Sequence, residues 1–244
     1  MLEVRALTKS FGALRATDGI DFDVAEGETH AVIGPNGAGK TTFISQLAGN
    51  LRPDSGSVRF AGADITNLSA PRRARMGLAR SFQITSVYPE FSALDNVMLS
   101  VLARSGRTGF WRTARGDPAL VEPAEHVLEE VGLLPRKNIL AANLAHGEQR
   151  QLEVAMALAT GPRLLLLDEP MAGMGTDESQ RMIALLQKLK QTKTIILVEH
   201  DMDAVFRLAD RISVLVYGRV IATDLPGKIK MNEEVRKAYL GEEA

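Results

Sequence analysis

The sequence contains no cysteine among its 244 residues. Disulfide bonds and thiolate metal sites are therefore excluded. Four histidines are present, but no two lie close together along the chain, which argues against a zinc site. A fold without such cross-links depends on a buried apolar core, and this length allows one large α/β domain or two small ones.

An excess of one charge and long apolar runs are also missing. Lys and Arg total 29 against 30 Asp and Glu, so a net charge of -1 creates no field that attracts nucleic acid, and we expect no nucleic-acid partner. No stretch approaches the roughly 18 apolar residues of a membrane helix. The first residues, MLEVRALTKSFG, lack the apolar segment of a signal peptide. We expect a soluble or peripheral protein.

Short apolar runs rich in β-branched residues predict buried strands at 29–33, 164–167, 194–198 and 212–216. Amphipathic helical patterns at 177–189 and 202–209 alternate with the last three, as a parallel sheet requires. Alternating segments at 20–24 and 57–60 predict antiparallel strands beside that sheet. The fold class is therefore α/β, with a mainly parallel sheet and an antiparallel β subdomain.

The middle of the chain, residues 85–159, has no convincing strand pattern. It contains helical patterns at 93–103, 123–131 and 148–158. We predict one domain over 1–244, in which this helical subdomain is inserted into an α/β core formed by 1–84 and 160–244. Residues 105–118, SGRTGFWRTARGDP, are basic and glycine-rich, which indicates a loop.

A glycine-rich segment, GPNGAGKTT, follows the predicted strand at 29–33 and precedes an apolar-periodic helix. Its spacing is the Walker A pattern, in which backbone N–H groups and a helix N-terminus converge on phosphate oxygens. We expect Lys40 to reach the β and γ phosphates of ATP, Thr41 to place its hydroxyl on Mg²⁺, and Thr42 to donate to a phosphate. The residues predicted to bind nucleotide here are Gly34, Pro35, Asn36, Gly37, Ala38, Gly39, Lys40, Thr41 and Thr42. The alternative is a glycine-rich turn without a ligand, but motif, strand and helix agree.

Two carboxylates follow the apolar run at 164–167. A strand that ends in Asp168 and Glu169 presents both at the carboxyl edge of a parallel sheet, where Walker B belongs. We expect Asp168 to hold Mg²⁺ through water and Glu169 to polarise the water that attacks the γ phosphate. An ordinary acidic strand end is the alternative, and the Walker A loop makes it improbable.

The strand at 194–198 is followed by Glu199, His200 and Asp201, which brings an imidazole to the same edge. His200 could sense the γ phosphate. On spacing alone, a capping or surface role at the start of a helix is favoured.

Three further motifs carry a family resemblance. Phe11 lies in SFGALRA before the Walker A loop, Gln83 lies in ARSFQ, and LAHGE occupies residues 144–148. With these motifs nearly the whole chain resembles an ABC transporter ATPase, a P-loop NTPase. The resemblance implies that Phe11 stacks on adenine, that Gln83 touches Mg²⁺ and links core to helical subdomain, and that His200 senses the γ phosphate. It also implies that LAHGE, the signature motif, completes the ATP site of the opposite subunit through Ala145, Gly147 and Glu148.

This sequence departs from the family pattern at several positions. Ala145 replaces the signature Ser, whose hydroxyl bonds the γ phosphate, and His146 and Glu148 replace Gly and Gln. Loss of one hydrogen bond to a charged group costs about 1.5 to 3 kcal/mol, which weakens ATP-driven closure without abolishing it. Gly175 stands where the D-loop usually has Asp or Asn.

The runs HGEQRQLEVAMAL, LVEHDMDAVF and VRKAYLGEEA resemble the ATPases of importers for branched-chain and other hydrophobic amino acids. The resemblance implies a second ATPase subunit, either a copy or a paralogue, and polytopic permease subunits. It implies a periplasmic or extracellular solute-binding protein indirectly, and a peripheral location at the cytoplasmic face of the membrane. Segment 87–102, with Tyr88, Phe91 and Leu94, is expected to receive a permease helix; the alternative is ordinary core packing.

Other functions are compatible with parts of the same pattern. An importer of urea or amides, or a lipid transport system, would use a similar ATPase. A soluble ABC ATPase that acts on DNA or ribosomes usually has coiled-coil insertions or a second cassette, and neither is seen. A non-hydrolysing ATP binder is disfavoured because Lys40, Asp168, Glu169 and His200 are all present.

Overall fold

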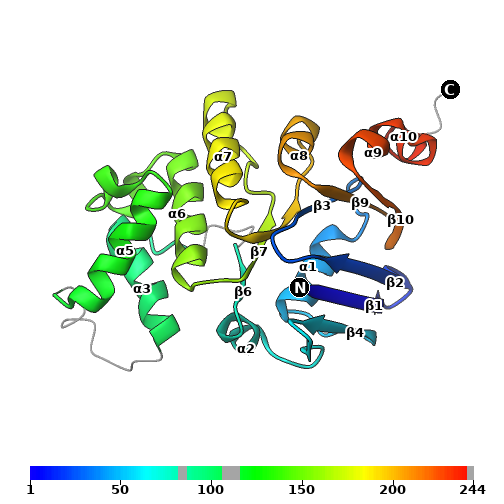
Figure 1. The fold of residues 1–244 in the computed structure, drawn as a ribbon, viewed down its shortest axis with the longest axis horizontal. Coiled ribbons are helices and arrows are strands. Elements are labelled where there is room, and N and C mark those ends of the chain that lie inside the picture. The colour runs from blue at the N-terminus through cyan, green and yellow to red at the C-terminus, as the bar shows by residue number, and fades with distance from the viewer. Residues whose placement is uncertain (82–86, 106–115, 241–244) are drawn as a thin grey trace.

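A six-stranded sheet forms the centre of the molecule (Figure 1). The computed structural model describes residues 1–81, 87–105 and 116–240. The strands run in the order β10-β9-β3-β8-β7-β6, and β10 alone pairs antiparallel to its neighbour. Their bounds are β3 (Thr29–Ile33), β6 (Leu78–Arg80), β7 (Leu164–Asp168), β8 (Thr194–Val198), β9 (Arg211–Val216) and β10 (Arg219–Asp224).

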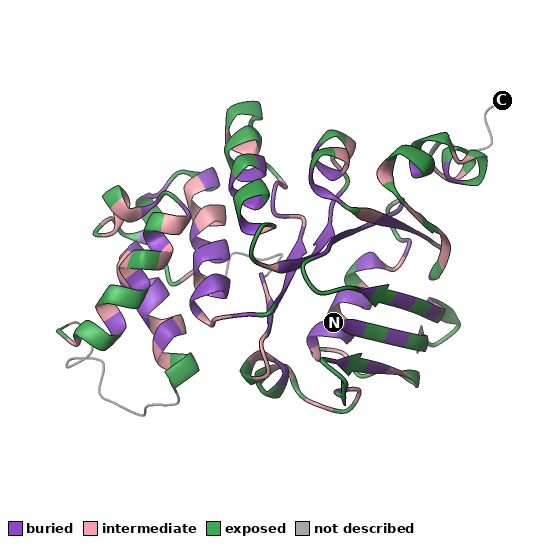
Figure 2. Cartoon of the chain, viewed as in Figure 1, coloured by how far each residue is buried: buried purple, intermediate pink, exposed green. Residues whose placement is uncertain are grey.

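The central strands are apolar because both faces of the sheet are covered. Every residue of β3, β7 and β8 is buried (Figure 2). The four predicted strands are confirmed; β7 extends one residue further and β9 begins one residue earlier. Two edge strands were not predicted, because β6 is three residues long and β10 is only partly buried.

A second, antiparallel sheet has the order β2-β1-β4-β5, which confirms the predicted strand type. Buried and exposed residues alternate along much of it, so one face packs inward (Figure 2). Phe22 of this sheet packs edge to face against Phe43 of helix α1 (Lys40–Ala48), at a centroid distance of 5.2 Å. The bounds are β1 (Leu2–Phe11), β2 (Leu14–Val24), β4 (Ser55–Phe60) and β5 (Ala63–Asp64).

Helices occupy the described part of segment 87–159, without a strand there, and lie together at one end of the molecule (Figure 1). They are α3 (Ala93–Ser105), α5 (Pro118–Glu130) and α6 (His146–Ala159), with short 3-10 turns η1 (Leu134–Arg136) and η2 (Ala141–Asn143). The predicted helices are confirmed, but α5 begins five residues earlier than expected. The reason is that Asp117 caps it by accepting the Ala119 N–H at 3.0 Å, with Pro118 in the first turn. Most of the predicted loop at 105–118 lies outside the described residues.

The remaining helices flank the two sheets. The predicted α7 and α8 are confirmed within one residue of their bounds, whereas α2, α9 and α10 were not predicted. The bounds are α1 (Lys40–Ala48), α2 (Ala70–Arg75), α7 (Thr176–Leu189), α8 (Met202–Leu208), α9 (Pro226–Met231) and α10 (Glu233–Leu240). Within the described residues, no helix has both the length and the apolar composition needed to cross a bilayer.

Arg73 of α2 fixes the far end of α1. Its guanidinium is fully buried and donates to Gln46 O at 2.8 Å and Leu47 O at 2.7 Å, two carbonyls in the last turn of α1. It also donates to Leu68 O and Thr66 O, each at 3.0 Å. The negative end of the α1 dipole favours a cation there. One side chain therefore holds the helix that follows the phosphate loop.

We expect Arg73→Met to lower the free energy of unfolding by about 3 kcal/mol, because it leaves several buried carbonyl groups without donors. For a chain of this size the midpoint of thermal unfolding should fall by about 6 to 12 °C. Arg72→Met, on the exposed neighbour, is the matched control and should change the midpoint by less than about 2 °C. Equal effects of the two substitutions would contradict this anchoring role.

Candidate functional site

The phosphate loop, residues 34–42, is clamped between two neighbouring backbones. A Cβ atom at Gly34 would lie 2.1 Å from Leu215 O, and one at Gly39, where φ is 104°, would lie 2.1 Å from Ala16 O. The Gly218 N–H also donates to Ala38 O at 2.9 Å. Glycine is therefore required at 34 and 39 by the protein's own packing, in addition to any approach of phosphate.

Lys40 begins α1 and is 7% exposed. Its ammonium donates to Gly34 O at 2.7 Å and Pro35 O at 3.1 Å. Burial lowers the pKa of Lys40, and the charges of Glu169 and Asp168 partly oppose that shift. The structure thus brings the predicted lysine within electrostatic reach of both predicted carboxylates.

Asp168 ends β7 and is 2% exposed. Its Oδ2 accepts a hydrogen bond from Arg80 Nη2 at 2.8 Å, while its Oδ1 is buried without a hydrogen-bond partner among the described residues. A buried carboxylate oxygen without a donor, beside a helix that carries the Thr41 hydroxyl, provides the oxygen ligands that Mg²⁺ prefers. These residues fit the ion. Arg80 was not predicted as a site residue, because it lies 88 positions from its partner in the chain.

Glu169 has a backbone conformation that side chains rarely adopt, with φ at 50°. Its N–H donates to Val198 O at 2.9 Å, which ties it to the end of β8. His200 Nδ1 lies 4.0 Å from Glu169 Oε1, and the imidazole is 64% exposed. The cap of α8 is Asp201, which accepts the N–H groups of the following turn. His200 is therefore a surface residue beside Glu169 and is not the helix cap.

Glu199 is a buried carboxylate that sequence reasoning did not assign. It is 1% exposed and accepts the N–H groups of Met171 at 3.0 Å and His200 at 3.1 Å. Burial raises the pKa of Glu199, and these hydrogen bonds oppose the shift. Glu199 thus links the segment after Glu169 to the residue that carries the imidazole.

The LAHGE segment begins α6, next to the start of α7. Ala145 is the N-cap of α6, and its N–H donates to Glu148 Oε2 at 2.9 Å. The buried Gly147 N–H donates to Glu178 Oε1 at 3.2 Å, and the Gly175 N–H donates to the other oxygen of Glu178 at 3.2 Å. Sequence reasoning missed Glu178, which joins the predicted signature and D-loop segments. In the described residues no hydrogen bond or ion pair links LAHGE to the phosphate loop.

One predicted nucleotide contact, Phe11, lies in the antiparallel sheet. Phe11 ends β1 and is 50% exposed, with Lys9 Nζ 5.8 Å from its ring centroid. The adjoining strand β2 carries Ala16 against Gly39, so the hairpin borders the phosphate loop. Gln83 lies outside the described residues. The roles of the individual residues stay predictions.

A family model described as ABC transporter matches residues 17–172. The chain belongs to the ABC transporter family. A second model, described as branched-chain amino acid ATP-binding cassette transporter, matches residues 219–244.

Individual relatives of this ABC cassette cover its whole length. The high-affinity branched-chain amino acid transport ATP-binding protein BraF of Pseudomonas aeruginosa is 39% identical, over 99% of this chain and 98% of its own. A nucleotide-free ATP-binding cassette from an ABC transporter superimposes with a TM-score of 0.89 at 28% identity, and the ADP conformation of a cassette does so with 0.87 at 28%; each match covers 99% of both chains. The predicted family, its P-loop fold and its class as an ABC ATPase that binds ATP are confirmed.

We expect Ala145→Ser to stabilise the ABC cassette. The Glu148 half of a capping box is already present, and a hydroxyl at position 145 can accept the Glu148 N–H and complete it. N-caps contribute about 1 kcal/mol, so the thermal midpoint should rise by about 2 to 4 °C. Ala142→Ser, in an exposed position of η2, is the control and should leave it unchanged. No rise with Ala145→Ser would show that the α6 N-terminus is already satisfied.

Proposed function

We propose that this chain is the ATP-hydrolysing subunit of an importer for branched-chain or other hydrophobic amino acids. The observation that carries this is the full-length similarity to a branched-chain amino acid transport ATP-binding protein. The match of residues 219–244 to a model of the same branch supports it. This second match also favours amino acids over urea, amides or lipids as the transported class.

The side chains at the sheet edge suit ATP hydrolysis. Lys40 exchanges two neutral carbonyl acceptors for phosphate oxygens, which form stronger, charge-assisted bonds. Thr41 and Asp168 would hold Mg²⁺, with Gln83 added by family resemblance, and the ion would supply positive charge against the β and γ phosphates. Glu169 orients the attacking water as general base.

His200 supports Glu169 and senses the γ phosphate. Its imidazole is exposed beside the Glu169 carboxylate, so a phosphate in the loop and the base can both reach it. The buried Glu199 carboxylate accepts the His200 N–H and so holds this part of the backbone in place. The arrangement gives the imidazole a donor role toward a developing negative charge.

One chain supplies half of each site. Phe11 and the Walker residues bind the nucleotide from one side, and Ala145, Gly147 and Glu148 of a second ATPase subunit, a copy or a paralogue, close the other. Residues 85–159 form the helical subdomain of a single nucleotide-binding domain over 1–244. ATP therefore drives dimerisation, and hydrolysis resets the dimer.

Glu169→Gln should lower ATP hydrolysis by about 100-fold or more, because an amide cannot accept the proton of the attacking water. ATP then accumulates in a dimer, which size-exclusion chromatography with light scattering measures directly. Adding Lys40→Ala to the same chain is the control and should abolish the dimer. Unchanged turnover in Glu169→Gln would refute the assignment of Glu169 as the base.

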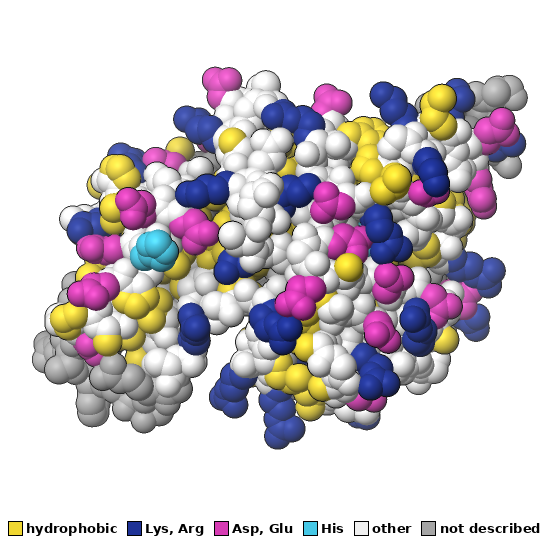
Figure 3. Space-filling view, in the orientation of Figure 1, with side chains coloured by type: hydrophobic (Ala, Val, Ile, Leu, Met, Phe, Trp, Pro, Cys, Tyr) yellow, Lys and Arg dark blue, Asp and Glu magenta, His cyan; other side chains and the backbone are white. Residues whose placement is uncertain are grey.

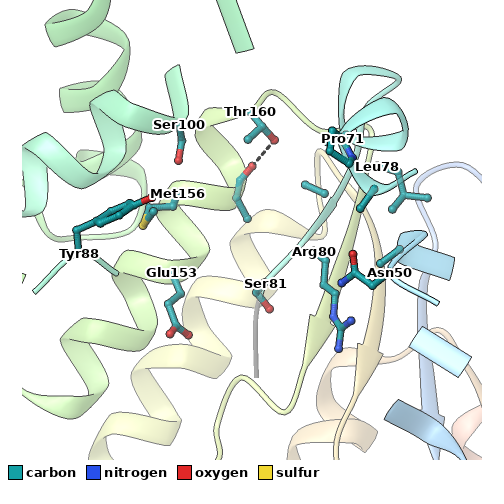
Figure 4. A pocket seen from close by; sticks show the side chains of 15 residues that line it. Asn50, Pro71, Leu78, Arg80, Ser81, Tyr88, Ser100, Glu153, Met156 and Thr160 are labelled. Carbon is teal, nitrogen blue, oxygen red and sulfur yellow. Dashed lines mark hydrogen bonds between the residues drawn. The ribbon is translucent and has the colours of Figure 1, made fainter. Parts of the chain in front are cut away.

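A groove lies between strand β6 with helix α2 on one side and helices α3 and α6 on the other, and it is a candidate docking site for a permease. Its volume is about 520 Å³. Tyr88 and Met156 line it from the helical side, and Pro71 and Arg80 from the sheet side (Figure 4). The surface is hollowed between these two parts of the molecule (Figure 3). Tyr88 is 54% exposed, whereas Leu94 packs on the helical core, so Tyr88 is the better candidate for contact.

We infer that a cytoplasmic helix of a polytopic permease occupies this groove, at the cytoplasmic face of the membrane, with a solute-binding protein on the opposite side. An apolar, partly aromatic groove of this kind suits the apolar face of a helix. The ATPase is then a peripheral membrane protein.

Tyr88→Asp should reduce recovery of membrane subunits with the tagged chain from solubilised membranes by about tenfold, because it places a charge in the groove. ATP binding by the isolated chain should not change. Leu225→Asp is the matched control, since Leu225 is also 54% exposed but lies at the start of α9. Equal recovery with both variants would exclude the groove as the docking site.

A further inference from the structure

Arg80 connects three parts of the molecule. It is the last residue of β6, and its side chain is 11% exposed. Nη2 donates to Asp168 Oδ2 at 2.8 Å, and Nη1 donates to Ser45 Oγ at 3.2 Å. The same side chain lines the groove (Figure 4).

The Asp168 carboxylate needs this cation. Asp168 is 2% exposed, and a buried carboxylate without a paired charge or hydrogen bonds is strongly unfavourable. Arg80 occupies one oxygen, Oδ2, and Oδ1 has no hydrogen-bond partner within the part of the chain that the structure describes. Without a metal, one oxygen of Asp168 is thus hydrogen-bonded to a cation and the other is not.

Ser45 accepts the second hydrogen bond of the Arg80 guanidinium. It belongs to α1, the helix that also carries Thr41. Arg80 therefore sets the position of Asp168 relative to the helix that bears Thr41, another proposed metal ligand.

We propose that Arg80 is a positioning residue for the metal site: it holds Asp168 Oδ2, compensates the buried charge when no metal is bound, and leaves Oδ1 to face Mg²⁺. This rests on the proposed function, because that function assigns Asp168 to the metal. A guanidinium with only a structural role would stabilise the protein equally with and without Mg²⁺ and nucleotide. One that compensates Asp168 becomes partly redundant once a second cation is near.

The test is thermal unfolding of Arg80→Gln in EDTA and in saturating MgADP. We expect the midpoint to fall by about 5 to 10 °C in EDTA, and by less than half as much in MgADP. Arg163→Gln is the matched control, since Arg163 lies beside the same strand β7 in an exposed pair with Glu26, and it should change neither midpoint by more than about 2 °C. Equal deficits of Arg80→Gln in the two conditions would overturn the proposal.

A second variant keeps the test informative if Arg80→Gln does not fold. The double variant Arg80→Gln with Asp168→Asn removes the buried charge together with its partner, so we expect it to fold and to melt above Arg80→Gln in EDTA. If the losses in thermal midpoint caused by Arg80→Gln and by Asp168→Asn simply add in the double variant, the proposal is overturned. The wild-type midpoint must rise with MgADP; if it does not, the proposed ATPase function fails, independently of Arg80.

Discussion

The backbone contacts that hold the phosphate loop are the constraint on which the rest of the site depends. Leu215 O at the end of β9 and Ala16 O on β2 approach positions 34 and 39 so closely that only glycine fits. These contacts orient the start of α1, and Arg73 fixes its other end. Both ends of α1 are thus held, and the Lys40 ammonium at its start donates to Gly34 O and Pro35 O. The carboxyl ends of parallel β7 and β8 then deliver Asp168, Glu169 and His200 to the same edge.

Charge at this edge is balanced within the protein. Lys40 and Arg80 face Asp168 and Glu169, and burial of each group is tolerable because an opposite charge lies near. Under the proposed function, ATP and its metal would replace some of these pairs, so that each buried charge keeps a partner of opposite charge.

Local signals in the sequence predicted what depends on near neighbours. The apolar strands, the Walker A loop and the acidic pair each occupy a short segment, so composition and spacing revealed them. Strand β6 was not predicted, because three residues are too few to show a strand pattern and its pairing with β7 is not visible in the sequence. The Arg80 to Asp168 pair and the contact of Glu178 with Gly147 join residues 88 and 31 positions apart. Nothing in a linear pattern specifies which arginine or glutamate is chosen.

Departures from the family pattern were visible in the sequence, but their physical meaning was not. Ala145 and Gly175 each begin a helix without a side chain that can cap it. In both cases a glutamate three residues later accepts the free N–H. The glutamate half of a capping box is thus present at both helices, whereas the half that an N-cap side chain would supply is missing.

The position of β3 in the sheet dictates when the phosphate loop can form during synthesis. β3 is translated early, yet its two neighbours in the sheet are β8 and β9, so about 180 residues separate Ile33 from the end of β9. At 5 to 20 residues per second, roughly 10 to 40 s pass before both neighbours have been made. The hairpin of β1 and β2, whose pairing is local, can fold long before. A nascent chain therefore carries the apolar strand β3 without its sheet neighbours until β8 and β9 have been made, and the backbone support of the phosphate loop is complete only then.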